Sequence, residues 1–524
     1  MKESLLNQVK EANKVDADSD FSLVSLLASL DQKEQIIQHK TTVIAEQKKR
    51  IDILEEYLRL ERSRRFTSSS EKNSPQEEMQ FDEAESLAEQ DDQPTEEPPK
   101  SLSKKQGGRK GLSPKLPRTQ IYLSLSDEEK EGAIDTFFTV VKEELDIIPA
   151  HVRVLEYLQE KAVFINQEKE RKIKSATLPK HPLNKCIASI SMLAFIIISK
   201  YCDGLPLYRL EGIVKRYGGN ITRTSLARWM IRVALEMQPL INLMREHQLA
   251  YDYLQIDETR IKVLKEAEKS PTSDKWMWVS RGGPPDKPVI LFDYDPSRGK
   301  EVPVRLLEGF KGYLQCDGLA SYNEFCKTNQ LIQLGCMDHA RRKFVEAQKG
   351  IDPKKKKKTS MADVAVNKIG QLYAIERKIK DLPAEEKYRY RQEHSVPKLD
   401  ELKIWLDEKI TKTPKGGLTY KAIYYALNQW EKLIAYCQDG RLNISNVLAE
   451  NAIRPFVIGR KAWLFSDTTH GAKASGTLYS IIETAKANGL EPFQYVKEVL
   501  SRLPYAESVE DIEALLPWNV NIRG

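Results

Sequence analysis

Cysteine is scarce in this sequence, and the few cysteines present form no motif. No two of them are spaced as a CxxC pair, on which structural zinc sites depend, and they do not form a disulfide framework. We therefore expect neither feature, and free thiols of this kind indicate a reducing, intracellular compartment. The six cysteines stand at positions 186, 202, 316, 326, 336 and 437.

A hydrophobic run long enough to cross a membrane is also missing. The most apolar stretch, CIASISMLAFIIIS at residues 186–199, is shorter than the roughly 20 residues that a spanning helix needs. The N-terminal MKESLLNQVKEANK has no apolar centre followed by a cleavage site, so we expect no signal peptide. The pattern predicts a buried helix at 186–199, no membrane partner and a cytoplasmic protein.

Net charge is nearly absent, because 82 Lys and Arg face 76 Asp and Glu, which leaves +6. The charges are nevertheless segregated along the chain. Residues 67–100 are acidic and almost without large apolar side chains, so they predict a disordered linker. Residues 101–120 are basic. Their Gly-Gly-Arg-Lys, with Arg109 and Lys110, is typical of AT-hook-like arms that enter the DNA minor groove, and a solvated linker is the alternative.

The first 66 residues carry a heptad pattern. Apolar residues recur every seven positions, which predicts a long helix that self-associates as a coiled coil into a homodimer or higher oligomer. A single amphipathic helix packed on its own domain is the alternative. The repeated positions are Leu23, Leu30, Ile37, Ile44, Ile51 and Leu58.

Residues 183–245 contain a helix-turn-helix pattern. The first helix should end at Tyr217, Gly218-Gly219-Asn220 suits a tight turn, and Thr222 or Thr224 can cap the second helix. The outer face of that helix would then contact DNA, whereas a plain helical hairpin with solvated arginines is the alternative. The candidate contacts are Arg223, Thr224, Ser225 and Arg228.

In residues 246–350 the spacing of apolar residues changes to a strand-like pattern interrupted by helical segments, which predicts an α/β core. Three sequential strands should form an antiparallel meander, and two later strands should add in parallel after helical crossovers, giving a mixed five-stranded sheet with helices. A helical insertion at 351–439 should interrupt this core, residues 440–500 should complete it, and 501–524 form a tail. Strands are expected at 251–264, 275–282, 288–295, 312–317 and 331–336, and helices at 297–308, 318–326 and 338–348.

Two carboxylates fall where the first and fourth of these strands are expected to end. If the strands are neighbours, Asp257 and Asp317 lie together at one rim, and a divalent cation such as Mg²⁺ would offset their repulsion. Glu450 can supply a third carboxylate from a short helical pattern that Pro455 should end. Each acid has an ordinary alternative: a turn residue for the two aspartates, and an exposed helix charge for Glu450.

Nine stretches together resemble the insertion-sequence-66 family of DDE transposases, the transposase C protein of those elements. The resemblance implies a ribonuclease H-like core whose DDE triad is Asp257, Asp317 and Glu450, with two Mg²⁺ ions, or Mn²⁺ in their place, as cofactors. The stretches are RRFTSSSEK (64–72), GGRKGLSPKLPR (107–118), SKYCDGLPLYR (199–209), IDET (256–259), CDGLASY (316–322), GCMDHARRKF (335–344), LYAIER (372–377), DGRLNISNVLAENAIRPFVIGRKAWLF (439–465) and LYSIIETAKANGLEPFQYVKEVL (478–500).

Such an enzyme binds the terminal inverted repeats of its element, cleaves the strand and transfers the 3′-hydroxyl to target DNA. We expect transposon-end DNA, target DNA, a second copy and accessory proteins of the same element as partners, near the bacterial nucleoid. His339 is a candidate contact of the scissile phosphate. Further candidate DNA contacts are Arg341, Arg342, Lys343, Arg454, Arg460 and Lys461.

One departure from the family concerns residues 121–182, where the usual paired CxxC motifs are missing, so no zinc is expected. Two other functions stay open on the sequence alone. One is a non-catalytic DNA-binding protein derived from a transposase, and the other is a different ribonuclease H-like nuclease.

Overall fold

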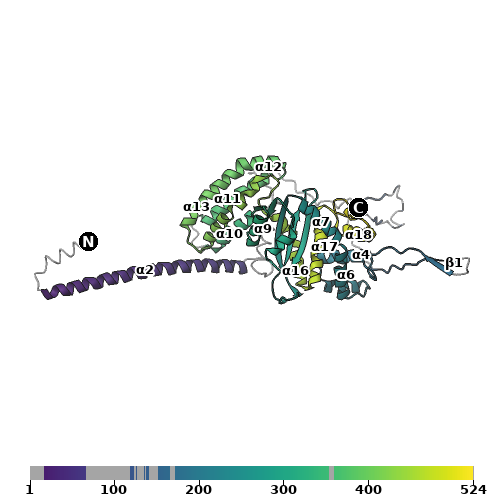
Figure 1. Ribbon diagram of the computed structural model, residues 1–524, viewed down its shortest axis with the longest axis horizontal. Coiled ribbons are helices and arrows are strands. Elements are labelled where there is room, and N and C mark those ends of the chain that lie inside the picture. Colours follow the sequence, from purple (N-terminus) through teal and green to yellow (C-terminus); the bar gives the residue numbers. More distant parts are fainter. Residues whose placement is uncertain are drawn as a thin grey trace.

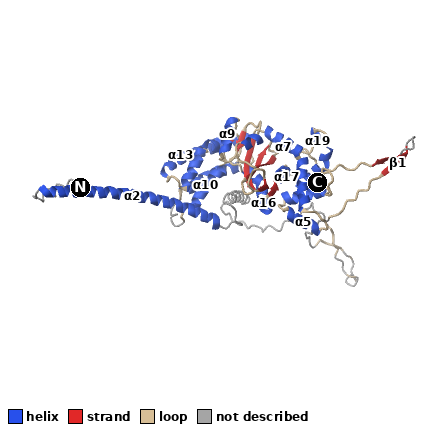
Figure 2. Ribbon diagram, turned by 60° about the horizontal axis from the view of Figure 1, so that its bottom comes forward, coloured by secondary structure: helices blue, strands red, loops and turns tan. Residues whose placement is uncertain are grey.

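The computed structural model describes residues 17–66, 152–165, 171–352 and 359–522, with scattered positions between 119 and 140. At its centre lies a five-stranded mixed sheet with the strand order β6-β5-β3-β7-β8 (Figures 1 and 2). The strands are β3 (Tyr253–Ile261), β5 (Lys275–Gly282), β6 (Val289–Asp295), β7 (Tyr313–Gln315) and β8 (Ile332–Leu334). The predicted acidic linker, the basic arm with Arg109 and Lys110, and the lysine run at 354–358 lie outside the described residues.

The topology confirms the expected meander. β3 pairs antiparallel with β5, and β5 pairs antiparallel with β6. The chain then passes through α8 (Glu301–Leu306) to β7, which is parallel to β3, and through α9 (Ala320–Thr328) to β8, which is parallel to β7. The first and fourth of the expected strands are therefore neighbours, and the mixed sheet is compatible with a ribonuclease H-like core.

Alternation along β3 divides its side chains between the two faces of the sheet. Leu254 and Ile256 belong to an apolar cluster with residues of α8 and α9. Gln255 and Asp257 point to the opposite face, and α16 (Val447–Trp463) packs against β3. One face is thus an ordinary apolar layer, whereas the other carries buried polar residues beneath a helix.

Six helices, together with α16, share one hydrophobic core with β5 and β6. They are α4 (Ile190–Tyr201), α5 (Leu207–Arg216), α6 (Arg223–Glu236), α7 (Gln238–Ala250), α17 (Thr469–Ala487) and α18 (Pro492–Arg502). The short α19 (Val509–Glu513) follows them. α4 is the helix expected within 186–199, and among the described residues no helix is long and apolar enough to cross a membrane.

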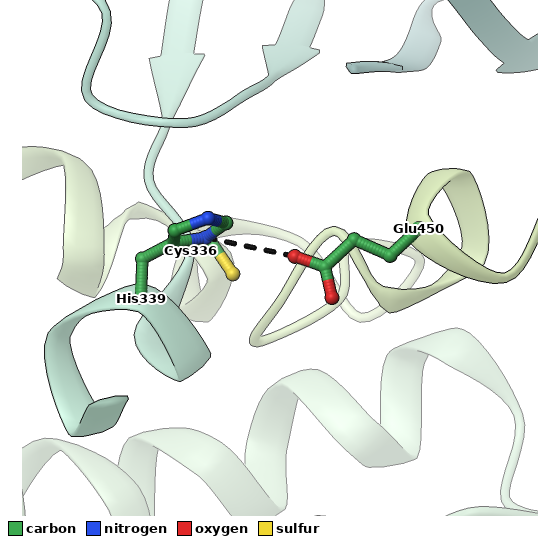
Figure 3. A group of neighbouring side chains, drawn as sticks. All are labelled: Cys336, His339 and Glu450. Carbon is green, nitrogen blue, oxygen red and sulfur yellow. Dashed lines mark ion pairs between the residues drawn. The ribbon is translucent and has the colours of Figure 1, made fainter. Parts of the chain in front are cut away.

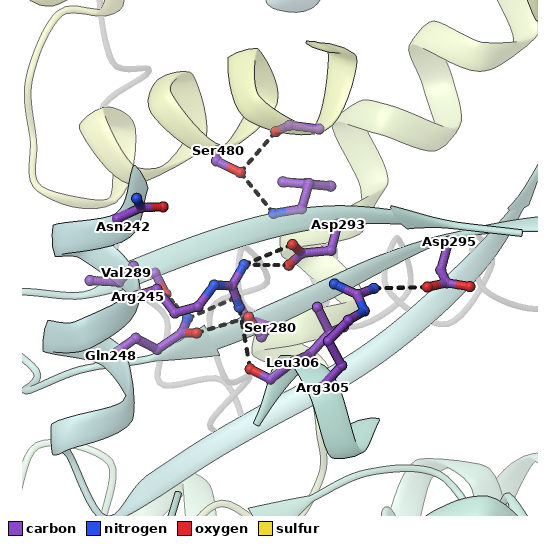
Figure 4. A network of polar contacts seen from close by, with 12 residues as sticks. Asn242, Arg245, Gln248, Ser280, Val289, Asp293, Asp295, Arg305, Leu306 and Ser480 are labelled. Carbon is purple, nitrogen blue, oxygen red and sulfur yellow. Dashed lines mark hydrogen bonds and ion pairs between the residues drawn. The ribbon is translucent and has the colours of Figure 1, made fainter. Parts of the chain in front are cut away.

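Polar contacts fix α7 and α17 on the edge strand β6 (Figure 4). Arg245 of α7 donates to both carboxylate oxygens of Asp293 at 2.7 Å, and Gln248 donates to backbone carbonyls of β5 and β6. On α17, the Ser480 hydroxyl accepts the Phe292 amide at 2.8 Å. These contacts occupy polar backbone groups that an edge strand otherwise leaves unpaired.

The segment expected to be a helical insertion is helical. It forms its own apolar cluster with α10 (Met337–Gly350) beside β8. Its elements are α11 (Met361–Lys378), α12 (Ala384–Tyr390), a π-helical turn at Arg391–Ser395, α13 (Val396–Lys412), α14 (Leu418–Asn428), α15 (Trp430–Ile434) and a 3₁₀ turn at Ala435–Gln438.

The N-terminal helix α2 (Ala17–Phe66) is long and projects from the body of the molecule (Figure 1). Only its C-terminal end packs on the insertion: Leu60 is buried with Ala347 and Leu418, and Arg64 pairs with Glu346 at 2.8 Å. Farther out, the apolar heptad side chains are exposed, so self-association stays a prediction. The exposed heptad residues are Leu30, Ile37, Ile44, Ile51 and Leu58.

The first core strand is shorter than predicted. β3 ends at Ile261, and the chain continues as β4 (Val263–Lys265), which pairs in parallel with β9 (Ser466–Thr468). Asp257 lies in the middle of β3, so its predicted place at the strand end is wrong. In the part of 121–182 that the structure describes, β1 (Lys161–Ile165) and β2 (Arg171–Ser175) form an antiparallel hairpin.

Pro455 lies inside α16, so the prediction that it ends this helix is wrong. A proline removes one helical hydrogen bond because it has no N–H. The residues that follow it, Phe456 and Val457, are buried in the core. Packing of this apolar side on the sheet outweighs the local cost, and the helix continues to Trp463.

A candidate active site of buried carboxylates

Strand pairing brings Asp257 and Asp317 to one place. β3 and β7 are parallel with Gln255 opposite Gln315, and Asp257 and Asp317 each lie two residues further on, Asp317 just beyond the end of β7. The charge of Asp317 acts on Asp257, so the two carboxylates are near each other. Asp317 opens the turn after β7, where its carboxylate accepts the Leu319 amide at 2.9 Å. The proximity that the sequence predicted follows from this register.

The surroundings of Asp257 disfavour its ionised form. Burial raises the pKa of Asp257 well above its usual value, and the charges of Glu258, Glu450 and Asp317 raise it further. Burial also raises the pKa of Asp317, while Arg298, 3.8 Å away, acts against this shift. A divalent cation among these carboxylates would relieve both the repulsion and the cost of burial.

Glu450 stands in the first turn of α16 and faces the interior. It is 6% exposed, so the alternative of a solvated helix charge is wrong. Its charge acts on Asp257, and its Oε1 lies 3.6 Å from Nδ1 of His339. α16 therefore brings a third carboxylate, from a distant part of the sequence, to the face that carries the two aspartates.

Buried glutamines hold the start of α16 on the sheet. Gln255 accepts the Ala449 amide at 3.1 Å and donates to Gln315 at 2.8 Å. Gln315 donates to the Asn443 carbonyl, also at 2.8 Å. Because Ala449 immediately precedes Glu450, these bonds fix the third carboxylate relative to the strands that carry the aspartates.

The sequence analysis missed these glutamines, although the sequence contains their signal. YLQID at 253–257 and YLQCD at 313–317 repeat the same spacing, and the two segments pair tyrosine with tyrosine, leucine with leucine and glutamine with glutamine. A repeated pentapeptide in two strands predicts that they are neighbours in register. The hydroxyl of Tyr253 completes the network by donating to Gln315 at 2.6 Å.

Glu258 follows Asp257 in sequence but faces the other side of the sheet. Its carboxylate accepts from the Arg298 guanidinium at 2.8 Å and from the Tyr322 hydroxyl at 2.7 Å. Glu258 is thus a buried carboxylate compensated by a cation and a hydroxyl. Arg298, which also reaches Asp317, was not singled out from the sequence.

Cys336 and His339 face Glu450 from the start of α10 (Figure 3). Their Sγ and ring nitrogen and one Glu450 oxygen all lie within 4.8 Å of one another. Burial, followed by the charges of Arg342 and Lys343, lowers the pKa of His339 to about 3, so its imidazole is neutral at pH 7. The three side chains therefore form a group that could hold a metal ion.

The predicted basic residues on α10 lie beside the site. Arg341, Arg342 and Lys343 are half-buried, and the Lys343 ammonium lies 4.6 Å from the centre of the Tyr425 ring. Tyr425 comes from α14 in the insertion and packs on the turn after Asp317, where a Cβ on Gly318 would lie 2.9 Å from its hydroxyl. The insertion therefore contributes a side chain to the site that the sequence analysis did not identify.

The basic residues of α16 differ in their exposure to solvent. Lys461 is exposed and Arg454 is half-buried, so both remain available to DNA. Arg460 is only 8% exposed, and its guanidinium donates to the Thr259 hydroxyl and the Arg260 carbonyl. Because this side chain holds α16 on β3, we remove Arg460 from the candidate DNA contacts.

The helix-turn-helix pattern has the expected local structure. α5 ends at Arg216, Gly218 has a φ of 87°, and Thr222 caps α6 by accepting the Ser225 amide at 3.3 Å. The inner face of α6 belongs to the shared core, where α6 packs on α17. Its predicted DNA-contacting side chains are accessible: Arg223, Thr224 and Arg228 are exposed and Ser225 is half-exposed.

The three carboxylates fit a hard divalent cation. Mg²⁺ prefers oxygen ligands, and Asp257, Asp317 and Glu450 offer only oxygen. Their mutual repulsion, seen in the raised pKa of Asp257, is what a bound cation would remove. This set of acids, on two paired strands and a covering helix, is typical of metal-dependent enzymes that act on phosphodiesters.

The chain belongs to the transposase IS66 family, whose sequence profile matches residues 185–474. The IS66 C-terminal element matches residues 480–518, and the segment described as transposase C of IS166 homeodomain matches residues 53–121. The chain is therefore similar to this family from the end of α2 almost to the C-terminus. The homeodomain match lies before the predicted helix-turn-helix at 183–245.

Similar proteins occur in Sinorhizobium fredii, and they are uncharacterised. The protein y4qI is 31% identical over 391 residues, which cover 72% of this chain and 70% of y4qI. The protein y4jD is 29% identical over 400 residues, which cover 74% of this chain and 76% of y4jD.

Proposed function

We propose that this protein is a DNA transposase that cleaves the ends of an insertion sequence and joins them to target DNA through Asp257, Asp317 and Glu450. The observation that carries the proposal is the pairing of the two YLQxD strands beneath Glu450. It brings together acids from three distant segments, of which Asp257 and Glu450 are buried and Asp317 is half-buried. Membership of the transposase family supports the reaction class.

The three acids would hold two Mg²⁺ ions, with Mn²⁺ as a substitute. Bound ions would supply Lewis-acid activation of the attacking hydroxyl and stabilise the leaving oxygen. The protein contributes position: strand pairing places the aspartates, and the glutamine network places Glu450. Water attacks in the cleavage step and the released 3′-hydroxyl in the joining step, so no protein nucleophile is required.

DNA would lie across the start of α10 and the exposed side of α16. Arg341, Arg342 and Lys343 would hold the backbone near the site, with His339 at the scissile phosphate and Arg454 and Lys461 farther along. The exposed face of α6, with Arg223 and Arg228, and the basic arm would read the terminal repeats. Pairing of two copies through α2 would bring two ends together for concerted cleavage.

The test uses the purified full chain, a duplex carrying the element's end, and Mg²⁺. We expect nicked ends, and we expect Asp257→Asn, Asp317→Asn and Glu450→Gln each to lower the cleavage rate by at least about 1,000-fold while end binding persists. Glu324→Gln, an exposed carboxylate on α9, is the matched control and should cleave normally.

The outcomes separate the alternatives. Normal cleavage by any of the three variants removes that residue from the triad. End binding by the wild-type protein without cleavage in Mg²⁺ or Mn²⁺ would identify a non-catalytic DNA-binding protein. Cleavage without joining would identify a nuclease.

A further inference from the structure

We propose that Cys336, His339 and Glu450 form a second cation site, which takes a borderline-soft divalent ion such as Zn²⁺ and withdraws Glu450 from the triad. The site is distinct from the carboxylate cluster in its ligands, because it offers one sulfur, one nitrogen and one oxygen. The binding claim stands on its own, whereas the effect on catalysis rests on the proposed function.

The geometry is close to that of a three-ligand zinc site. Nδ1 of His339 lies 3.6 Å from Oε1 of Glu450, and all three ligand atoms lie within 4.8 Å of one another. Zinc bonds of roughly 2.0–2.3 Å place tetrahedral ligands about 3.3–3.8 Å apart, so small side-chain movements would close the site. The fourth position would take water.

The backbone presents the ligands from two helix starts. Cys336 is the N-cap of α10 and His339 lies in its first turn, so a single turn supplies sulfur and nitrogen on one side. Glu450 enters from the first turn of α16 and faces them (Figure 3). The glutamine network that fixes the start of α16 also fixes this distance, so the pocket is largely formed before an ion binds.

The polar atoms point to a ligand that is not a protein group. Nδ1 of His339 is buried and makes no hydrogen bond within the described structure, although Glu450 lies 3.6 Å away. An imidazole nitrogen placed in this way can bind a metal ion while the other ring nitrogen carries the proton. Cys336, 1% exposed, would release its thiol proton on binding, and thiolate and carboxylate together would balance a 2+ charge.

The two sites should select different ions. A thiolate favours Zn²⁺ over Mg²⁺, and Mg²⁺ favours the all-oxygen set. Both sites need Glu450, so an ion on Cys336 and His339 would leave the two aspartates without their third partner. Zinc would therefore act as an inhibitor rather than as a cofactor.

Cobalt(II) is the probe for binding, because it replaces zinc and reports its ligands in its spectrum. The full-length protein, without DNA, is titrated with Co²⁺ in the presence of excess Mg²⁺. We expect one equivalent to produce tetrahedral visible bands and a near-ultraviolet thiolate-to-cobalt band, both removed by Zn²⁺. Cys336→Ser should abolish the thiolate band, and His339→Asn should weaken Co²⁺ affinity by at least about 100-fold.

Cys186→Ser is the matched cysteine control and should leave the spectrum unchanged, because Cys186 lies before α4, outside the site. Circular dichroism confirms that each variant is folded, and an Asp257→Asn/Asp317→Asn double variant tests independence from the triad. The double variant should retain the thiolate band. Absence of that band in the wild type, or its survival in folded Cys336→Ser, would overturn the proposal.

A cleavage assay then tests the consequence. Micromolar Zn²⁺ added to the Mg²⁺ reaction should inhibit cleavage by the wild-type protein, and a chelator should restore it. A thiolate band without inhibition would keep the cation site and overturn its link to Glu450 in catalysis. If no cleavage occurs under any condition, the proposed transposase reaction fails while the binding result stands.

Discussion

The two faces of the central sheet treat buried carboxylates in opposite ways, and Asp257 and Glu258, adjacent in β3, show the contrast. Glu258 is met by the Arg298 guanidinium and the Tyr322 hydroxyl. Asp257 is met by the charges of further carboxylates, which raise its pKa beyond the effect of burial. Both side chains are almost fully buried, at 4% and 5% exposure, so burial alone does not separate them.

The difference teaches how to tell a structural acid from a candidate catalytic acid. A protein that needs a buried carboxylate for stability supplies a cation for it, because an uncompensated charge is costly. A site that holds a diffusible cation keeps its acids together at the expense of stability. Glu258, which is bonded to a cation, is a scaffold acid, whereas Asp257 lies among further carboxylates, as a cation site requires.

The largest expected effect comes from neutralising Asp257. Asp257→Asn should lower cleavage by at least about 1,000-fold and, in EDTA, should raise the melting temperature, since it removes a repelled buried charge. Glu258→Gln should lower the melting temperature because it leaves Arg298 without its carboxylate. Paired thermal melts and cleavage rates measure both. A melting temperature that falls in Asp257→Asn would break the contrast between the faces.

Removing the cation from the scaffold face should destabilise the protein. Arg298→Met leaves the buried Glu258 carboxylate with the Tyr322 hydroxyl as its neighbour. We expect the free energy of unfolding to fall by about 2 kcal/mol. This loss is smaller than the usual loss for a broken buried ion pair, because the guanidinium is partly exposed. Urea unfolding measures the loss. The double variant Arg298→Met/Glu258→Gln should recover part of it, and strictly additive losses would contradict the pairing.

The glutamine network should affect catalysis through position. Gln315→Leu keeps the side chain's size but removes its bonds to Gln255 and Asn443. We expect the turnover rate to fall about 10- to 100-fold with little change in the KM for end DNA, because Glu450 loses its fixed place. Gln315→Glu keeps the acceptor but turns a carboxylate oxygen toward the Gly335 and Asn443 carbonyls, so it should lower the rate at least as much. A change confined to KM would indicate a role in DNA binding instead.

The smallest effect is a pH dependence of stability. A carboxyl whose pKa is raised on folding keeps a proton that the unfolded chain has released, so stability in EDTA should fall as pH rises above about 4 toward the raised value. The slope is at most about 1.4 kcal/mol per pH unit for each group. Asp257→Asn should flatten it more than Glu258→Gln, since the pKa of Asp257 is raised further. Equal flattening, measured by urea unfolding across pH, would contradict the distinction.

Much of the core followed from local patterns. Apolar patterns located all five strands of the sheet, and the crossover rule allowed the first and fourth to be neighbours, which the strand order bears out. The prediction for Pro455 was wrong because it also rested on local sequence alone. Pro455 is a breaker in isolation but lies inside α16, because buried residues on both sides of it keep the helix on the sheet.

Arg460 shows that a basic residue in the sequence does not by itself identify a DNA contact. Placed after Glu450 in a run with Lys461, it resembles a DNA contact, yet it is buried against β3 while Lys461 is exposed. Sequence spacing indicates which residues lie on the same helix. It does not give the angle at which that helix meets a sheet, which decides whether a guanidinium faces solvent or a backbone carbonyl.

The amino-acid sequence alone determined the order of the core strands and the family resemblance, and it pointed to the three candidate acids, because periodicity and motif spacing are local properties. Tertiary structure decided which groups surround each acid. Arg298, Tyr322 and the Cys336–His339 pair reach the site from segments that no local pattern connects to the three acids, and only chain folding in three dimensions sets those distances.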